Sequence, residues 1–330
     1  MSTRNLLRLG AEAAKALVLA LVFFLLAGQK TFAAPNWTAI QAAMKAPGTE
    51  MPGNVLRFEL VRQDLTVTVD GQTLPLVYVA SVANGFVAFK RTSGNEFFVD
   101  GSLPAQETEV AALQTALRLN THIHITAIVN HVILETPKLI WVHFEATGNG
   151  TQLARSVATA LETIQNPQVD VSVIPGTNTV IVPSTILPAN LLTVFNQGFV
   201  EQLTDIFAFY LPRPDENRFT VGGVPAESGL GVGQSFYIQF SFSGGTDITL
   251  NIDFALRAGE VQPVEDALRA GGFTITSESN HFVSETPRLF FVHATASGDG
   301  LTLGNTLYSV IQIIQADPPS GSLSREEDRE

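Results

Sequence analysis

The chain repeats one uncommon phrase at an interval of 150 residues. "NHVILETPKLIWVH" occupies residues 130–143, and "NHFVSETPRLFFVH" occupies residues 280–293. When residues 130–153 are aligned with residues 280–303, 12 of the 24 positions are identical. The similarity extends upstream, where "EVAALQTALR" (109–118) matches "EVQPVEDALR" (260–269) and "FELVRQD" (58–64) matches "FYLPRPD" (209–215). Self-similarity at a nearly constant interval, 150 residues for the phrase and 151 for the two upstream matches, indicates a tandem duplication of a structural unit.

Each unit shows the same order of expected elements. A leading helix at 37–44, or 191–198 in the second unit, precedes alternating segments that predict strands, in the first unit at 55–61, 65–71, 85–91 and 96–103. A helix over 109–118 follows, with Val110, Leu113 and Leu117 on one face. Two strands flank the repeated phrase, and a helix closes the unit. The order predicts an α+β fold: two tandem units, each an antiparallel sheet with helices on one face and a ferredoxin-like β-α-β-β-α tail.

Composition shifts set the expected boundaries. We predict a signal peptide (1–33), a first repeat unit (34–166), a linker with room for a hairpin (167–188), a second repeat unit (189–316) and a disordered acidic tail (317–330). Units of about 130 residues are near the usual size of a domain.

The N-terminal segment has the three parts of a secretory signal. Arg4, Arg8 and Lys15 precede the apolar run "ALVLALVFFLLAG" (16–28), which is shorter than the about 20 residues that a membrane span needs. Small residues at the −3 and −1 positions predict cleavage after Ala33. We therefore expect a secreted or periplasmic protein with no stable membrane insertion after cleavage. An uncleaved anchor is the alternative.

Charge and cysteine content exclude several classes of function. The chain has no cysteine, which excludes disulfides, thiolate metal sites, cysteine nucleophiles and a lipid-modified N-terminal cysteine. The net charge of −12 argues against nucleic acid as a partner. The partners that remain are an unidentified small molecule or an envelope protein.

The repeated phrase predicts a β-hairpin. "HIHITAIVNH" and "KLIWVHFE" are both strand-like, and the short "VILETP" joins them. A register in which paired residue numbers sum to about 270–272 places His143 opposite Ala127 or Val129, and it separates the imidazoles of His131 and His143 by roughly 7–13 Å. A metal shared within one hairpin would then be strained.

The polar residues of the phrase are the candidate site. Their types bind divalent metals, the one cofactor that the pattern suggests. The candidates are His131, Glu135, His143, His281, Glu285 and His293, with Asn130 and Asn280 as secondary members. Structural histidines are our first interpretation. A metal site is the alternative, and it requires either a bent strand or a ligand from the other unit.

A second pair of polar positions also recurs. Arg62 with Asp64, and Arg213 with Asp215, fall on one strand face. The spacing predicts surface ion pairs at a sheet edge, each contributing about 0–1 kcal/mol. A clamp for a substrate carboxylate is the alternative.

The units resemble the LppY/LpqO family of exported bacterial proteins, which has no assigned activity. The resemblance rests on "VTVDGQTLP" (67–75), on the two "EV…ALR" segments and on the repeated phrase, and it covers nearly the whole chain after the signal segment. It implies a two-unit protein that is secreted or lipid-anchored. Family members typically carry a further histidine where this chain has Val129 and Ser279, which weakens the metal interpretation. Without the lipidation cysteine, this member is expected to be released.

Three functions follow as hypotheses. A non-catalytic ligand-binding or interaction module is preferred, because the sequence contains no recognisable catalytic motif. A metal-dependent hydrolase with glutamate as general base is the first alternative. A structural envelope component is the second.

Overall fold

The computed structural model describes residues 37–62, 64–69, 72–73, 84–133, 135–164, 168–169, 184–195, 199–203, 206–211, 213, 215, 218–227, 229–231, 236–242 and 245–315. All of them belong to one compact unit, Asn36–Glu330. The predicted signal peptide, the predicted tail and most of the predicted linker lie outside these residues. Among the helices of the described ranges, none has the length and apolar character needed to cross a membrane.

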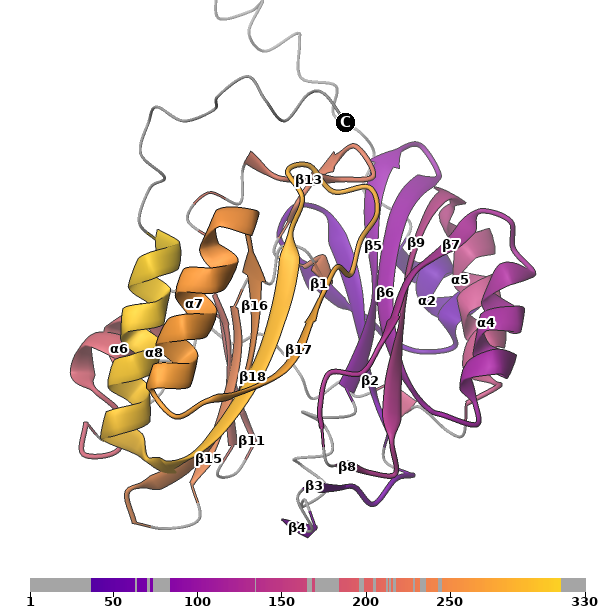
Figure 1. Ribbon diagram of the computed structural model, residues 1–330. Coiled ribbons are helices and arrows are strands. Elements are labelled where there is room, and N and C mark those ends of the chain that lie inside the picture. Colours follow the sequence, from indigo (N-terminus) through magenta and orange to yellow (C-terminus); the bar gives the residue numbers. More distant parts are fainter. Residues whose placement is uncertain are drawn as a thin grey trace, which may run out of the picture. The chain divides into compact units, whose positions relative to one another are not determined.

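The first repeat is an antiparallel sheet with helices on one face (Figure 1). Its strands, in spatial order, are β1 (Thr49–Met51), β2 (Val55–Val61), β5 (Asn84–Ser93), β6 (Glu96–Gln106), β9 (Leu139–Asn149) and β7 (Ile123–Val129), and β10 (Gln168–Val169) pairs with β2. Its helices are α2 (Trp37–Met44), α4 (Val110–Arg118) and α5 (Gly150–Leu161).

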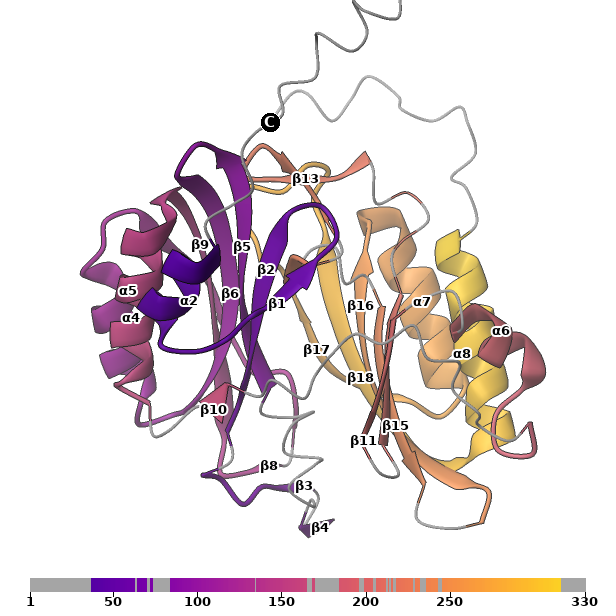
Figure 2. The same cartoon turned by 180° about the vertical axis from the view of Figure 1, so that it is seen from behind.

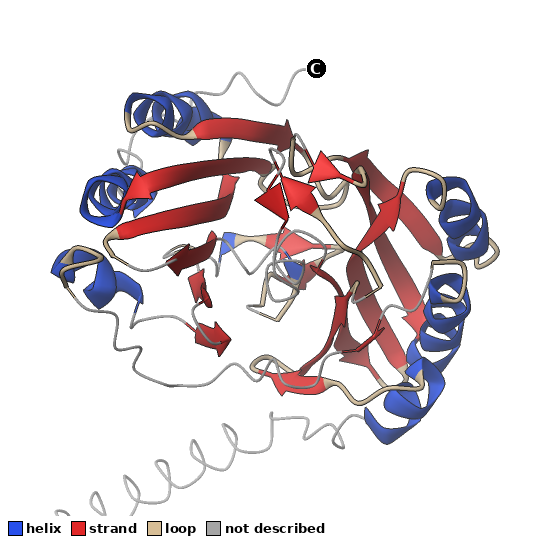
Figure 3. Ribbon diagram, turned by 90° about the horizontal axis from the view of Figure 1, so that it is seen from below, coloured by secondary structure: helices blue, strands red, loops and turns tan. Residues whose placement is uncertain are grey.

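The second repeat builds the same sheet in the same order (Figure 2). Its strands are β11 (Phe199–Leu203), β12 (Ile206–Leu211), β15 (Phe236–Phe242), β16 (Asp247–Leu256), β18 (Phe290–Asp299) and β17 (Thr274–Ser279). Its helices are α6 (Ala189–Phe195), α7 (Ala258–Ala270) and α8 (Gly300–Gln315). The predicted fold class, with two tandem units and helices on one face of each sheet, is confirmed (Figure 3).

The predicted β-α-β-β-α tail places β9 between β6 and the edge strand β7. Strands β6 and β7 each pair antiparallel with β9, so they run parallel to each other with α4 connecting them. In the second repeat β16, α7, β17, β18 and α8 have the same relation. The repeated phrase therefore begins directly after β7 or β17 and continues into β9 or β18.

Alternation along β9 and β18 decides which side chains can form a site. Val142 and Phe144 pack into the core beneath the helices of the first repeat, and Val292 and Ala294 do the same in the second. Successive strand residues point to opposite faces, so His143 and its equivalent His293 project from the helix-free faces. Both histidines are nevertheless buried.

A shared apolar cluster covers these helix-free faces. It combines Val55, Ala88 and Phe98 of the first repeat with Phe282 and Phe291 of the second. The short strands β13 (Thr220–Val221) and β14 (Val224–Pro225) add Val221 to it. Each repeat thus buries one sheet face under its own helices and contributes the other face to an interface within the chain.

The described part of the predicted strand at 65–71, residues 65–69, does not pair with the main sheet. Within that part Thr68–Val69 forms a strand, β3, which pairs with β4 (Gln72–Thr73) and with β8 (Glu135–Thr136) in a separate small sheet. Strand β8 belongs to the repeated phrase. In the second repeat, a bridge between Thr220 and Thr286 corresponds to the pairing of β3 with β8.

Candidate functional site

The predicted register of the hairpin is confirmed, since Ala127 lies opposite His143. Beyond Val129 the chain leaves the sheet, and side chains hold the connection. The Asn130 amide donates to the Leu139 carbonyl (2.7 Å) and to Glu135 Oε1 (2.6 Å). Glu135 Oε1 also accepts the Leu139 N–H at 3.3 Å.

The second repeat closes its connection in the same way. Asn280 donates to the Leu289 carbonyl (2.6 Å), and Glu285 accepts the Leu289 N–H (3.4 Å) and pairs with Arg288 at 3.3 Å. Asn130, Asn280, Glu135 and Glu285 thus shape the hairpins and do not line the cavity described below.

The predicted separation of the histidines is wrong. The Nε2 atoms of His131 and His143 lie 3.2 Å apart, not roughly 7–13 Å. The prediction extended β7 through His131, whereas the strand ends at Val129 and the chain bends back so that the His131 ring stacks on Trp141 with centroids 4.4 Å apart.

The same geometry recurs in the second repeat. His281 and His293 bring their Nε2 atoms to 3.5 Å, and the His281 ring stacks on Phe291 at 4.0 Å. Trp141 and Phe291 are equivalent positions of the two repeats, so an aromatic ring supports the turned-back histidine in both.

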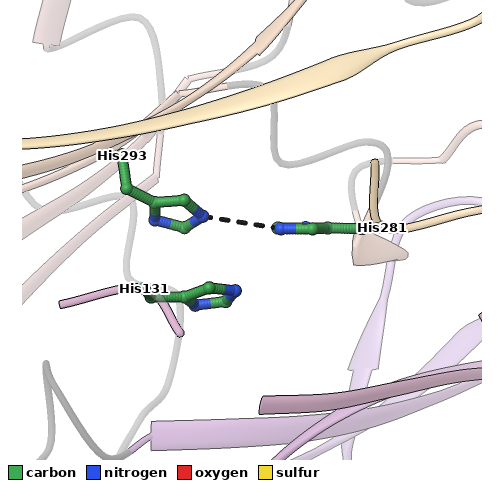
Figure 4. Close-up of side chains that lie close together, drawn as sticks. All are labelled: His131, His281 and His293. Atoms are coloured by element: carbon green, nitrogen blue, oxygen red, sulfur yellow. Dashed lines mark hydrogen bonds between the residues drawn. The ribbon is translucent and has the colours of Figure 1, made fainter. Parts of the chain in front are cut away.

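The two histidine pairs meet face to face. The ring of His131 stacks on that of His293 with centroids 4.0 Å apart, and the ring of His143 stacks on that of His281 at the same 4.0 Å. These four rings are called the histidine cluster below. Within it, His131, His281 and His293 each offer a ring nitrogen that lies within 4.8 Å of the others (Figure 4).

Each repeat holds the histidine loop of the other. Thr126 donates its hydroxyl to the carbonyl of His281 (2.6 Å), and Thr276 donates to the carbonyl of His131 (2.7 Å). Glu145 adds an asymmetric contact, because its carboxylate accepts the N–H of Val283 at 3.0 Å and the hydroxyl of Ser284. The cluster therefore depends on the docking of the two repeats.

A cavity of about 140 Å³ adjoins the histidine cluster. Besides the four histidines, its lining includes aromatic rings and several polar side chains: Phe86, Trp141, Phe282, Phe291, Arg57, Glu59, Asp100, Ser102, Asn251 and Asp253. Two buried carboxylate oxygens of this lining, Oδ1 of Asp100 and Oδ1 of Asp253, have no hydrogen-bond partner among the described residues. The Asp253 oxygen lies 3.6 Å from His293 Nε2.

Burial makes the histidines neutral at pH 7. It lowers the pKa of His143 and of His293 to about 3. Burial, reinforced by the neighbouring rings, lowers the pKa of His131 and of His281 well below the ordinary value. A neutral imidazole keeps one ring nitrogen with a free lone pair, which is the form that binds metals.

The spacing of the nitrogen atoms fits a metal ion. With metal–nitrogen bonds of about 2.0–2.1 Å, two imidazole ligands of a tetrahedral zinc ion have nitrogens about 3.3–3.4 Å apart. The pairs in the cluster measure 3.2 and 3.5 Å. Imidazole donors suit zinc, copper, iron and nickel.

The prediction of surface ion pairs for the two arginines is wrong in one respect. Arg62 does pair with Asp64, at 2.8 Å, but its side chain is 0% exposed. It also donates to the Glu109 carboxylate and to the Pro104 carbonyl. Glu109 ends the loop after β6, and folding brings it over the arginine.

Arg213 makes the equivalent set of bonds and is also buried. It donates to Asp215 at 2.9 Å, to Glu260 at 2.8 Å and to the Ala255 carbonyl at 2.8 Å. Neither arginine lines the cavity, so the geometry gives no support to a substrate clamp.

Several residues of the site were not among the predicted candidates. Thr126 with Thr276, and Trp141 with Phe291, recur at the 150-residue interval, and that recurrence is the signal that could have identified them. Asp253 has no such signal, because Ser102 occupies the equivalent position opposite His143.

Comparison with known proteins places the chain in a family. Residues 38–163 and residues 195–313 each match the family described as "Domain of Unknown Function (DUF1259)". The matches cover more than half of the chain, so it belongs to this family and carries the domain twice. The resemblance to the LppY/LpqO family stays a prediction. No curated protein matches the chain.

Two solved structures are similar to the chain at a low level. One is a trimeric bacterial microcompartment shell protein, PduB, at 10% identity over 79% of this chain and 87% of that chain, with a TM-score of 0.18. The other is EtuB from Clostridium kluyveri, at 11% identity over 81% and 89%, with a TM-score of 0.19. Likeness at these scores carries no inference about function.

Proposed function

We propose that this member of the DUF1259 family is a ligand-binding protein whose ligand is one divalent transition-metal ion, held by the histidine cluster. The observation that carries the proposal is the convergence of ring nitrogens from both repeats, with His131, His281 and His293 all within 4.8 Å of one another.

Structural histidines account poorly for this arrangement. Two neutral imidazoles whose Nε2 atoms face each other can share only one N–H, so one ring must adopt the donor tautomer. The four imidazoles, of which His131 is half-buried and the other three are buried, also bring no charge of their own to offset their desolvation. A dication between the rings would satisfy several lone pairs at once, which explains why neutral nitrogen donors are gathered there.

The duplication supports the same proposal. One repeat alone supplies two histidines, which is a weak metal site. The threonine bonds at 2.6 and 2.7 Å fix the loops across the interface, so that the two halves present their histidines to one point. A site that requires both repeats gives a physical reason for retaining them in one chain.

Metal binding can be measured directly on the full chain after removal of metal with a chelator. Equilibrium dialysis against zinc is expected to give one ion per chain, and the double variant His131→Ala/His281→Ala is expected to lose stoichiometric binding. His124→Ala is the matched control, because His124 is exposed on β7 and outside the cluster. A double variant that binds zinc as well as the parent chain would overturn the proposal.

A metal-dependent hydrolase is a second candidate, because a cavity of about 140 Å³ adjoins the cluster. A bound zinc ion would activate a water molecule as nucleophile. The predicted general bases, Glu135 and Glu285, accept hydrogen bonds from the hairpin backbone instead. Hydrolysis of a small activated ester by zinc-loaded protein, lost in the double variant, would support this candidate.

We also propose that the chain is exported. The signal segment predicts a chain that is cleaved after Ala33 and released outside the cytoplasm. N-terminal sequencing of the protein recovered from its native cells is expected to begin at Ala34. An N-terminus at Met1 or Ser2 would show instead that the segment is retained.

A further inference from the structure

We infer that the carboxylate of Asp253 binds the same metal ion, so that the donor set combines imidazole nitrogens with one carboxylate oxygen. This inference rests on the proposed function. It adds a ligand that lies outside the repeated phrase and has no counterpart in the first repeat.

Asp253 lies close to the histidine cluster. Asp253 on β16 lies directly opposite His293 on β18, and its Oδ1 atom is 3.6 Å from His293 Nε2. The side chain also lines the cavity that contains the histidine cluster. A nitrogen and an oxygen bound to one tetrahedral ion lie about 3.3–3.4 Å apart, which is close to the observed 3.6 Å.

The Asp253 oxygen nearest to His293 lacks a hydrogen-bond donor among the described residues. Asp253 Oδ1 is buried and has no hydrogen-bond partner among the described residues. Burying a carboxylate without a donor is costly, and native structures usually supply a partner, an ion or a metal. A divalent cation beside His293 would give this oxygen the partner that it lacks among the described residues.

The two repeats differ at the position of Asp253. The residue opposite His143 in the first repeat is Ser102, whereas the residue opposite His293 is Asp253. The group of ligand atoms within 4.8 Å of one another consists of His131, His281 and His293, two of which belong to the second repeat; Asp253 lies next to this group through His293, at 3.6 Å. We therefore place the ion nearer to the second repeat, beside His293, and away from His143, which lies opposite Ser102.

This donor set has consequences for the choice of metal. Three imidazoles and one carboxylate suit borderline divalent ions such as zinc, ferrous iron and nickel, whereas Cu(I) prefers the thiolate and thioether sulfur that the described cavity lining does not contain.

Cobalt(II) is the probe for the test, because its visible absorption depends on the number and type of its ligands. The full chain is titrated with cobalt(II) as the parent protein and as Asp253→Asn. The variant is expected to bind at least about tenfold more weakly, a loss seen even for outer-shell partners, with shifted absorption bands. Asp253→Ser places at this position the residue that the first repeat carries, and it serves as a second variant if the amide does not fold.

Asp100→Asn is the matched control. Asp100 lines the same cavity and also has a buried oxygen, Oδ1, without a hydrogen-bond partner among the described residues. The residue opposite Asp100 on the neighbouring strand, however, is Glu145 and not a histidine. Its cobalt spectrum and affinity are expected to equal those of the parent chain. Unchanged binding in both Asp253 variants, with binding lost in His131→Ala/His281→Ala, would overturn this inference and leave the proposed function standing. A parent chain that binds no cobalt or zinc would overturn both.

Discussion

Thr126 in the first repeat donates its hydroxyl to the backbone carbonyl of His281 in the second, at 2.6 Å, and Thr276 returns the same bond to His131 at 2.7 Å. The two bonds are equivalent under the repeat. Each half of the chain therefore fixes the loop that carries the other half's turned-back histidine, and docking of the repeats is coupled to the geometry of the cluster.

Replacing Thr126 with valine removes this hydroxyl but keeps the side-chain shape. The His281 carbonyl then loses its donor, and we expect a loss of about 1–3 kcal/mol in the free energy of unfolding together with weaker zinc binding. Urea unfolding and a zinc titration measure the two effects. Thr126→Ser retains the hydroxyl and is the control. Equal metal affinity in the valine and serine variants would show that the bond does not position the histidine loop.

Replacing Arg62 with methionine tests the buried ion-pair network. The change removes the buried guanidinium that pairs with Asp64 and Glu109, and breaking a buried pair costs about 3–5 kcal/mol. Lys45→Ala is the comparison, because Lys45 pairs with Glu162 at 2.7 Å while both side chains are more than half exposed, and such a pair contributes about 0–1 kcal/mol. Chemical unfolding of both variants gives the two values. If both variants lost a similarly small free energy of unfolding, Arg62 would contribute no more than the surface ion pair that its sequence spacing predicts.

Stability of the metal-free chain should depend on Asp100. Burial raises its pKa to about 7, which Glu145 reinforces and the Gly231 N–H and Arg57 oppose. Between the ordinary pKa of 3.8 and this value the folded chain holds a proton that the unfolded chain lacks, so this group makes stability fall as pH rises from about 4 to about 7. Asp100→Asn is neutral throughout, and it should gain stability relative to the parent chain between pH 5 and pH 8.

Urea unfolding of both proteins at the two pH values, with a chelator present, measures that difference. Comparing variant with parent removes the contributions of the other titrating groups. A stability difference that stays constant from pH 5 to pH 8 would contradict the raised pKa of Asp100.

Trp141 offers an optical report on the cluster. Its ring stacks on His131 at 4.4 Å, whereas the second tryptophan, Trp37, packs in the core under the helices. Cobalt(II) bound at the cluster is expected to quench the fluorescence of Trp141, and Trp141→Phe, which installs the residue of the second repeat, should abolish the quenching. Quenching that persists in this variant would place the ion elsewhere.

The sequence predicted the modules well and the site poorly, for a physical reason. Alternation and helical spacing are local, so they sufficed for α4 and for the pairing of Ala127 with His143. The bend after Val129 depends on contacts with Trp141 and with the other repeat. Which sheet faces dock is a property of two complete units, and no local pattern contains it.

The same limit explains the arginines. The spacing of Arg62 and Asp64 predicted their pairing correctly, but burial comes from Glu109, which is 47 residues away from the arginine. Asp253 was missed because the repeat comparison favours positions that both halves share, and this position differs between them.

The central claim is that one metal ion binds where the two repeats bring their histidines together. Crystals of the zinc-loaded chain, measured on both sides of the zinc absorption edge, test it most directly. The account predicts a single strong anomalous peak about 2.0–2.2 Å from the ring nitrogens of His131, His281 and His293. A map with no peak at these nitrogens, from protein that is folded and saturated with zinc, would contradict it.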